Sequence, residues 1–303
     1  MAEIILEKYS GAVAVLSVGA AKEEGGTRGR AVKAGGQKAM PFLFAEGEAP
    51  NPPLVAYEVW DTPPQDWPEE LTKAWGSCLK DPFLWAEKCQ QEYRAKLICL
   101  RLAGAHPDAG DKTPQQEAQL VKEMLKRISL PLVIIGCGDD EKDNVVLPAC
   151  SEAAKGERCL FGSATQDNYK TLTAACLADG HSIIAESPID INIAKQLNIL
   201  ISDVGLPLGR IAINPTIGAL GYGLEYAYSI MERARLAALA GDKALAMPFA
   251  CFVGQEAWRA KERGVIWEAL TAAGLLQAGA DILVMRHPLA VEKANKHIER
   301  IFV

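Results

Sequence analysis

The stretch KLICLRLAGAHPDAGDKTPQQEAQLVKEMLKRISLPLVIIG, residues 96–136, decides the fold because it contains one complete strand–helix–strand unit. The apolar runs at 96–102 and 130–136 are typical of strands that are buried on both faces. Thr113, Pro114 and Gln116 indicate a helix start, with a capping hydroxyl, a proline at the first helical position and a glutamine that can bond back to the cap. Apolar residues then recur at helical spacing, at Ala118, Val121, Met124, Leu125 and Ile128.

The same alternation extends in both directions from this unit. Strands are predicted at 54–60, 96–102, 130–136, 158–163, 181–186, 210–214, 244–249 and 281–285, each followed by a helix. Strict alternation implies parallel pairing with right-handed crossovers, and eight units over about 250 residues match the size of a closed barrel. We therefore predict an α/β fold, a (β/α)8 TIM barrel over residues 54–303; the alternative is an open, doubly wound sheet.

The first 53 residues have a different pattern, and we predict an N-terminal β-hairpin and an irregular arm packed on the barrel. Glu3–Tyr9 and Ala12–Val18 alternate in polarity around a Ser10-Gly11 turn, which is typical of a hairpin. Residues 19–53 are rich in Gly and Pro and include the basic run TRGR at 27–30. Because long irregular arms are often interaction elements, we expect the hairpin and arm to form part of a contact with another chain.

Composition narrows the class of protein. The net charge of −6 disfavours nucleic-acid binding. No apolar run approaches the roughly 18 residues of a membrane span, and the N-terminus lacks the basic start and apolar core of a signal peptide, so we expect a cytoplasmic protein without membrane contact. The eight cysteines include no C-x-x-C pair, so they are predicted to be buried thiols rather than metal or cluster ligands.

Functional residues of such barrels lie where the strands end. The strand ends here carry hydrogen-bonding groups, small residues and some charge, at Glu58, Asp61, Arg101, 136–139, 163–165, 186–190, 214–218, Phe249, Arg286 and His287. Of the four histidines, only His106 and His287 are placed to reach this rim, so no metal site is predicted. The glycine-rich loop at 218–223 either holds a phosphate on backbone N–H groups or packs tightly.

Three rim residues have two interpretations each. Glu186 is either a general acid or base or, as we favour, a carboxylate bound by the backbone N–H groups of the next helix. Arg286 either binds an anion or pairs with a neighbouring acid. Cys137 lies in a Gly-Cys-Gly turn before a helix, where a thiol pKa can be lowered, but a structural role is favoured.

Four segments of the sequence resemble one protein family. They are GCGDDEKDN (136–144), CLFGSATQDNYK (159–170), AESPIDINIAKQLN (185–198) and INPTIGALGYGLEYAYSIMERARL (213–236). The family is the small subunit of the corrinoid/iron–sulfur protein of the anaerobic acetyl-CoA (Wood–Ljungdahl) pathway, which includes the archaeal delta subunit of the acetyl-CoA decarbonylase/synthase complex. The resemblance runs from about Glu3 to the C-terminus and is most specific over 186–236.

The resemblance implies one half of a heterodimeric methyl carrier. In this family the large corrinoid/iron–sulfur subunit brings a [4Fe–4S] cluster and most of the cobamide site. A methyltetrahydrofolate:corrinoid methyltransferase loads the methyl group, and acetyl-CoA synthase receives it. The small subunit is then a non-catalytic barrel that covers the cobamide. The residues agree, because the chain has no cluster-type cysteine spacing and no Asp-x-His-x-x-Gly motif for a cobalt-ligating histidine.

Barrel geometry alone selects the candidates for facing the corrinoid. They are Gly136, Cys137, Ser163, Ala164, Thr165, Glu186, Ser187, Asn214, Thr216 and Arg286. The alternative function is a stand-alone, pterin-dependent methyltransferase in which Asn214 and an acid hold the pterin. An aldolase-like lyase is disfavoured because no lysine stands at a strand end.

Overall fold

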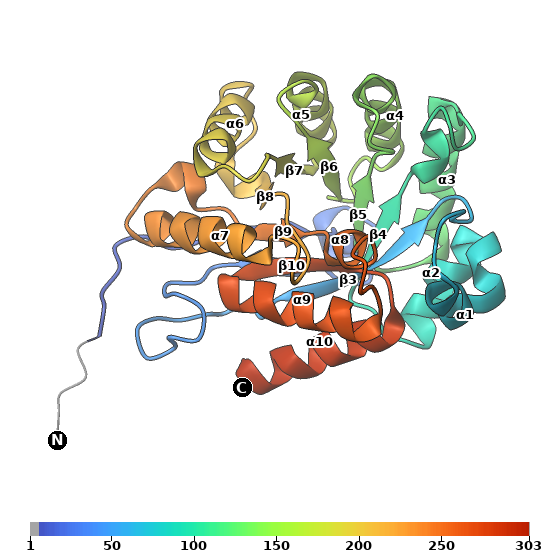
Figure 1. The fold of residues 1–303 in the computed structure, drawn as a ribbon. Coiled ribbons are helices and arrows are strands. Elements are labelled where there is room, and N and C mark those ends of the chain that lie inside the picture. The colour runs from blue at the N-terminus through green and yellow to red at the C-terminus, as the bar shows by residue number, and fades with distance from the viewer. Residues whose placement is uncertain (1–5, 303) are drawn as a thin grey trace.

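In the computed structural model, which describes residues 6–302, eight parallel strands form a closed barrel (Figure 1). The barrel strands are β3 (Leu54–Trp60), β4 (Leu97–Arg101), β5 (Leu132–Ile135), β6 (Leu160–Ala164), β7 (Ser182–Glu186), β8 (Ile211–Asn214), β9 (Phe249–Cys251) and β10 (Ala280–Met285). Pairing of Ile282 with Leu54 joins β10 to β3 and closes the ring. The predicted TIM barrel is confirmed, and the open-sheet alternative is wrong.

Helices surround the barrel and connect its strands. They are α1 (Glu69–Trp75), α2 (Pro82–Gln91), α3 (Pro114–Arg127), α4 (Asp140–Ala153), α5 (Tyr169–Asp179), α6 (Ile191–Asp203), α7 (Leu224–Leu239), α8 (Val253–Ala257), α9 (Val265–Ala278) and α10 (Pro288–Ile301). The predicted start of α3 is confirmed: the Gln116 N–H donates to Thr113 Oγ1 at 3.3 Å, and the Thr113 N–H donates to Gln116 Oε1 at 2.8 Å.

Two element boundaries near the C-terminus differ from the prediction. Only Phe249 of the run 244–249 belongs to its strand, because a 3-10 turn at Lys243–Leu245 and the following Pro248 delay β9 to Phe249–Cys251. The single helix predicted to follow this strand is two helices, α8 and α9, with a break before Gly264. This break matters for the site, because α8 lies at the ends of the strands.

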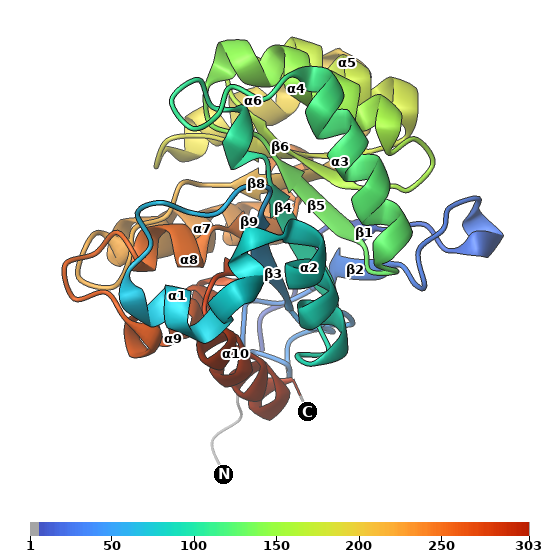
Figure 2. The same ribbon diagram turned by 90° about the vertical axis from the view of Figure 1, so that its right-hand side faces the viewer.

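The N-terminal segment closes one end of the barrel with an antiparallel pair of strands. β1 (Val15–Val18) pairs with β2 (Val32–Gly35), and the two lie side by side at the end where the barrel strands begin (Figure 2). Apolar side chains of both strands, such as Leu16 and Val32, join the cluster that fills the barrel interior. The segment is therefore a plug that contributes to the core.

The predicted N-terminal hairpin is confirmed, but its strands are β1 and β2 rather than 3–9 and 12–18. Residues 6–9 are not in a strand, and 3–5 lie outside the described residues. Gly11 is not a hairpin turn: its N–H donates to Leu239 O at 2.8 Å, and a Cβ would lie 2.2 Å from Ala238 O. Burial in the plug explains the apolar alternation of Ala12–Val18, and the strand's partner comes later in the chain.

Arg28, from the basic run, anchors this plug and is 3% exposed. Its Nε donates to Glu157 Oε2 at 2.8 Å and its Nη1 to Ile128 O at 2.7 Å. Thr27 also donates to Glu157, through its backbone N–H and its hydroxyl. The most basic part of the arm is therefore partly an internal ion pair rather than an exposed contact surface.

A second buried cluster of charged side chains lies beside the end of β3, around Lys112. Lys112 Nζ donates to Asp61 Oδ2 at 2.5 Å and lies 3.8 Å from Glu117 Oε1 on α3. Glu117 is fully buried, and burial together with the charge of Asp61 raises its pKa to about 8. Burial and the charge of Asp61 therefore favour the protonated form of Glu117.

We expect Glu117→Gln to stabilise the protein at pH 8 and to do so much less at pH 5. The carboxyl pKa is higher in the folded chain than in the unfolded chain, so stability is lost as pH rises from the unfolded pKa to the folded one. Each unit of pKa difference corresponds to about 1.4 kcal/mol. Urea unfolding at the two pH values checks this, with Glu123→Gln on the exposed face of α3 as control; an equal effect of Glu117→Gln at both values would contradict it.

None of the helices within the described residues is long and apolar enough to cross a membrane.

Candidate functional site

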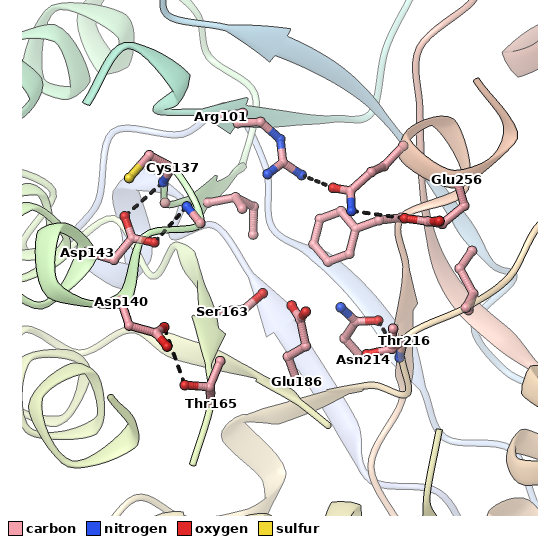
Figure 3. A pocket seen from close by; sticks show the side chains of 16 residues that line it. Arg101, Cys137, Asp140, Asp143, Ser163, Thr165, Glu186, Asn214, Thr216 and Glu256 are labelled. Atoms are coloured by element: carbon pink, nitrogen blue, oxygen red, sulfur yellow. Dashed lines mark hydrogen bonds between the residues drawn. The ribbon is translucent and has the colours of Figure 1, made fainter. Parts of the chain in front are cut away.

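A cavity of about 340 Å³ opens where the barrel strands end, and we call it the mouth cavity (Figure 3). Residues at or just after the C-terminal ends of β4 to β9 line it. They are Arg101, Ile135, Gly136, Cys137, Gly138, Asp140, Asp143, Ser163, Thr165, Glu186, Asn214, Thr216, Ile217, Phe252, Gln255 and Glu256.

Seven of the ten candidate residues line this cavity: Gly136, Cys137, Ser163, Thr165, Glu186, Asn214 and Thr216. The other three do not. Ala164 is fully buried and pairs with Ala185 in the sheet. Ser187 is 1% exposed, and its carbonyl accepts a hydrogen bond from Thr216 Oγ1 at 2.6 Å. Arg286 belongs to a charged cluster beneath the rim.

The Gly-Cys-Gly turn is organised by Asp143, on the first turn of α4. The Asp143 carboxylate accepts from the Cys137 N–H at 2.8 Å and from the Gly138 N–H at 3.0 Å. A Cβ on Gly136 would lie 2.3 Å from this carboxylate, so only glycine leaves room for it. Burial raises the pKa of the Cys137 thiol to about 12. The idea of a lowered thiol pKa is therefore wrong, and the structural role of the turn is supported.

Glu186 and Ser163 point into the cavity from adjacent strands (Figure 3). The favoured interpretation of Glu186 is wrong, because Asp190 caps the next helix instead, accepting from the N–H groups of Asn192 at 2.7 Å and Ile193 at 3.1 Å. Within residues 6–302 the Glu186 carboxylate has no hydrogen-bonding partner. It is therefore free to accept a hydrogen bond from a ligand.

The neighbouring strand supplies an amide beside this carboxylate. Asn214 stands directly opposite Glu186 in the β7–β8 register. Its Oδ1 accepts from the Thr216 N–H at 3.1 Å, which leaves the Nδ2 donors facing the cavity (Figure 3). The wall therefore presents an acceptor and a donor side by side.

One buried carboxylate holds two arginines at the edge of the mouth cavity. Glu58 Oε1 accepts from Arg101 Nε at 2.5 Å, and Glu58 Oε2 accepts from Arg286 Nε at 2.6 Å. Burial alone would raise the pKa of Glu58, but the two guanidinium groups outweigh burial and lower it to about 2. Of the two interpretations of Arg286, the structure supports pairing with an acid.

The remaining rim features are structural. A Cβ on Gly218 would lie 2.4 Å from Tyr222 O, so tight packing accounts for the glycine-rich loop. The His287 side chain accepts from the Leu289 N–H at 3.1 Å and caps α10. Within residues 6–302 no group of three or more His, Cys, Asp or Glu side chains is arranged to hold a metal ion.

Several lining residues were not among the candidates chosen from sequence. Arg101 and Gly138 were placed at the rim but not selected. Asp140 and Asp143 belong to the first turn of α4, and Gln255 and Glu256 to α8. The first turn of each helix that follows a strand lies near the strand ends, so Asp140 and Asp143 could be predicted from barrel geometry. Gln255 and Glu256 could not, because β9 starts later than the sequence predicts.

Comparison with known proteins identifies the family. The model for the family described as "CO dehydrogenase/acetyl-CoA synthase delta subunit" matches residues 22–294. The acetyl-CoA decarbonylase/synthase complex subunit delta of Methanothermobacter thermautotrophicus is 38% identical over 94% of this chain and 75% of that protein. The protein of the same name from Methanocaldococcus jannaschii is 35% identical over 95% of this chain and 73% of that protein.

The chain belongs to this delta-subunit family. Among solved structures it resembles dihydropteroate synthases. The enzyme of Xanthomonas albilineans aligns with a TM-score of 0.58 and 14% identity over 85% of this chain and 96% of that one. A Yersinia pestis dihydropteroate synthase aligns with a TM-score of 0.56 and 14% identity over 83% of this chain and 95% of that one. At this identity, the likeness shows only that this chain shares the TIM-barrel fold of these enzymes.

The cysteines of the chain are all free thiols, and most of them are buried. Burial raises the pKa of Cys99, Cys176 and Cys251, which lie on three different elements. They therefore behave as small apolar core residues.

Proposed function

We propose that this chain covers a cobamide bound by a larger corrinoid/iron–sulfur partner subunit. In this proposal the heterodimer carries a methyl group from methyltetrahydrofolate, through a methyltransferase, to acetyl-CoA synthase in the Wood–Ljungdahl pathway. The cobamide is shared with the large subunit, the [4Fe–4S] cluster belongs to the partner alone, and this chain is non-catalytic. Membership of the delta-subunit family supports the proposal, because the relatives are named as subunits of the acetyl-CoA decarbonylase/synthase complex.

The observation that carries the proposal is the mouth cavity, with its adjacent acceptor and donor at Glu186 and Asn214. A corrin ring is far larger than 340 Å³, so it would lie across the mouth rather than enter it. Its peripheral amide side chains offer both N–H donors and carbonyl acceptors. The half-buried carboxylate of Glu186, the Ser163 hydroxyl and the Asn214 amide fit such groups in chemistry.

The chain's own contribution would be to orient the ring and exclude water from its covered face. When bound, the cobalt supplies the atom that carries the methyl group. Cys137 supports the non-catalytic role, because its thiol has a pKa of about 12 and is held as the thiol at neutral pH. Glu58 is likewise committed to two arginines.

The proposal is tested by Ser163→Trp in the complex with the large subunit. Ser163 points into the cavity, and its hydroxyl has no hydrogen-bonding partner within the described residues, so an indole there obstructs the mouth without breaking a bond (Figure 3). Thr216 is less suitable because its backbone is left-handed, with a φ of 52°. We expect weaker cobamide retention and at least about tenfold slower methyl transfer, which corresponds to about 1.4 kcal/mol.

Ser202→Trp is the matched control, because Ser202 lies in the last turn of α6, at the opposite end of the barrel, and its hydroxyl also has no hydrogen-bonding partner within the described residues. It should leave both measurements unchanged. Unchanged retention and transfer in Ser163→Trp, with the variant folded by circular dichroism, would remove the mouth cavity from the corrinoid site.

A pterin-dependent methyltransferase is the second candidate, and the pairing of Glu186 with Asn214 favours it. An acid beside an amide could hold the edge of a flat bicyclic ring, and about 340 Å³ is at the small end of ligand pockets. Calorimetric titration of the isolated chain with methyltetrahydrofolate separates the two functions. Binding that is lost in Glu186→Gln would favour the enzyme, and absence of binding would favour the cover.

A further inference from the structure

A second cavity, of about 460 Å³, adjoins the mouth cavity, and we call it the tryptophan groove. The two cavities share Arg101, Cys137 and Gln255. The groove is lined by Trp60, Asp66, Trp67, Pro68, Arg101, Ala103, His106, Ala109, Cys137, Gln255, Trp258, Arg259 and Arg286. Three indoles and two adjacent arginines set it apart from the mouth cavity.

The two arginines share one carboxylate. Glu58 Oε1 is 2.5 Å from Arg101 Nε and 3.3 Å from Arg286 Nη2, so the guanidinium groups lie next to each other. Two positive charges therefore face one negative charge within ion-pair distance. The repulsion between the guanidinium groups is only partly offset, and a second anion beside them would offset the rest.

Each guanidinium keeps an unused donor. Arg101 Nη2 donates to Gln255 Oε1 at 3.0 Å, while Arg286 uses Nε and Nη2 on Glu58. The Nη1 atom of neither arginine has an acceptor within the described residues. Because Arg101 and Arg286 both line the groove, these donors are available to a bound acceptor.

The surrounding side chains hold Arg286 in one position. Its guanidinium lies over the rings of Trp60 at 5.3 Å and Trp67 at 5.2 Å, and its side chain is 9% exposed. Glu268 accepts from the Arg286 backbone N–H at 2.6 Å and from Trp258 Nε1 at 2.8 Å. The donors are therefore fixed before any ligand arrives, which lowers the entropic cost of binding.

The other charges of the groove lie at its rim and are mostly paired. Arg259 Nη1 is 3.1 Å from Glu256 Oε1, and both belong to the α8 region. His106 is 3.9 Å from Asp108. Asp66 also lines the groove, but no ion pair joins it to Arg101 or Arg286. Two further carboxylates act on the cluster: Glu186 on Arg101, and Glu268, which binds the Arg286 backbone N–H at 2.6 Å. The case for a bound acceptor therefore rests on the unused Nη1 donors of the two arginines.

We propose that the tryptophan groove binds a carboxylate carried on a flat apolar body. The two guanidinium groups would receive the carboxylate oxygens, as planar arginine forks do, and the indoles would cover the apolar body. The groove shares three lining residues with the mouth cavity, but its test uses the chain alone and a small ligand, so either proposal can fail without the other.

The test is titration of the full chain with benzoate and with benzamide, its neutral counterpart, followed by calorimetry and tryptophan fluorescence. Gln255→Glu is the decisive variant. It keeps an acceptor for Arg101 and adds a negative charge within the site, and it gives up the bond from Gln255 Nε2 to Glu256 Oε1. We expect benzoate to bind at least about tenfold more tightly than benzamide, because a hydrogen bond to a charged acceptor is stronger than one to a neutral acceptor. Gln255→Glu should remove that preference.

Arg101→Met is a second variant, in which Glu58 keeps one arginine and the cluster becomes neutral. It should weaken benzoate binding by a similar factor. Arg127→Met is the matched control, because Arg127 also stacks on an aromatic ring, Phe83 at 5.1 Å, and pairs with Glu87 at 3.3 Å, but on the exposed surface. It should leave benzoate binding unchanged.

The carboxylate could belong to a free small molecule or to the C-terminus of a partner chain. A peptide that ends in phenylalanine with a free carboxylate, compared with the same peptide as its amide, distinguishes these two sources. Binding of benzoate alone indicates a small molecule, and preference for the peptide acid indicates a chain end. Equal affinity for benzoate and benzamide, no binding of either acid, or full affinity in folded Gln255→Glu would each overturn the proposal.

Discussion

Replacing Glu58 with glutamine is expected to destabilise the fold by about 3–5 kcal/mol, the cost of removing one partner from a buried ion pair. Glu58 is fully buried and is the only carboxylate within ion-pair distance of Arg101 and Arg286 in the described chain. The variant would leave two adjacent guanidinium groups without a counter-charge. Urea unfolding at pH 7 measures the loss.

The control for this prediction is Glu48→Gln, because Glu48 pairs with Lys38 at 3.0 Å and its side chain is 76% exposed. Such a pair contributes at most about 1 kcal/mol. The pKa of Glu58 is lower in the folded chain, so its contribution is present above the ordinary carboxyl pKa and is lost as pH falls towards about 2. Arg101→Met should partly rescue Glu58→Gln. A Glu58→Gln loss no larger than that of Glu48→Gln would refute this account of the cluster.

Arg28→Ala is expected to have a comparable effect, about 3–5 kcal/mol, because it leaves a buried carboxylate unpaired. Glu157 is 7% exposed and would lose its guanidinium partner. The carbonyls of Ile128 and Leu130 would lose their donors as well. The plug of β1 and β2 would keep its apolar contacts and the bonds from Thr27 to Glu157, but it would lose the ion pair that neutralises this carboxylate.

Arg30→Ala is the matched control, from the same basic run. Arg30 is exposed, and its one side-chain bond, to Ala95 O, is 3.4 Å long. Thermal unfolding of both variants decides the matter: a large shift for Arg28→Ala and almost none for Arg30→Ala is expected. Equal small shifts would mean that the run is a surface feature after all.

Deletion of the N-terminal segment cannot test whether the arm binds a partner, because the plug is part of the barrel core. Leu16, Val18, Val32 and Ala34 are part of the barrel's interior cluster. Deleting residues 1–50 would therefore expose the core, and loss of the complex would report on folding. Substitutions of exposed arm residues such as Leu43 and Phe44 separate the two effects.

The barrel was predictable because its units repeat. Each strand is an apolar run, and the α3 start at Thr113 uses only local bonds. The plug was not predictable in the same way, because β1 pairs with a strand that begins at Val32 and both depend on distant barrel residues for burial. Alternation at 3–9 and 12–18 suggested the nearest partner, and the long-range contacts selected another.

The position of the site was predictable from the sequence, but the pairing of its charged side chains was not. Strand ends converge in any such barrel, so Ser163, Glu186 and Asn214 meet as expected. The sharing of Glu58 by Arg101 and Arg286 joins residues 43 and 228 positions apart. No local pattern indicates which acid will meet which base, so Arg286 was assigned to the rim when it belongs to the cluster beneath it.

The visible spectrum of the purified complex tests the central claim most directly. The chain should be expressed together with its large partner subunit, and also alone, and both preparations reconstituted with cobamide. The account predicts cobamide absorption bands in the complex that are absent from the chain alone and weakened in the complex carrying Ser163→Trp. A chain that retains no partner, or a complex whose bands are identical with and without Ser163→Trp, would contradict the claim that the mouth of this barrel covers a corrinoid.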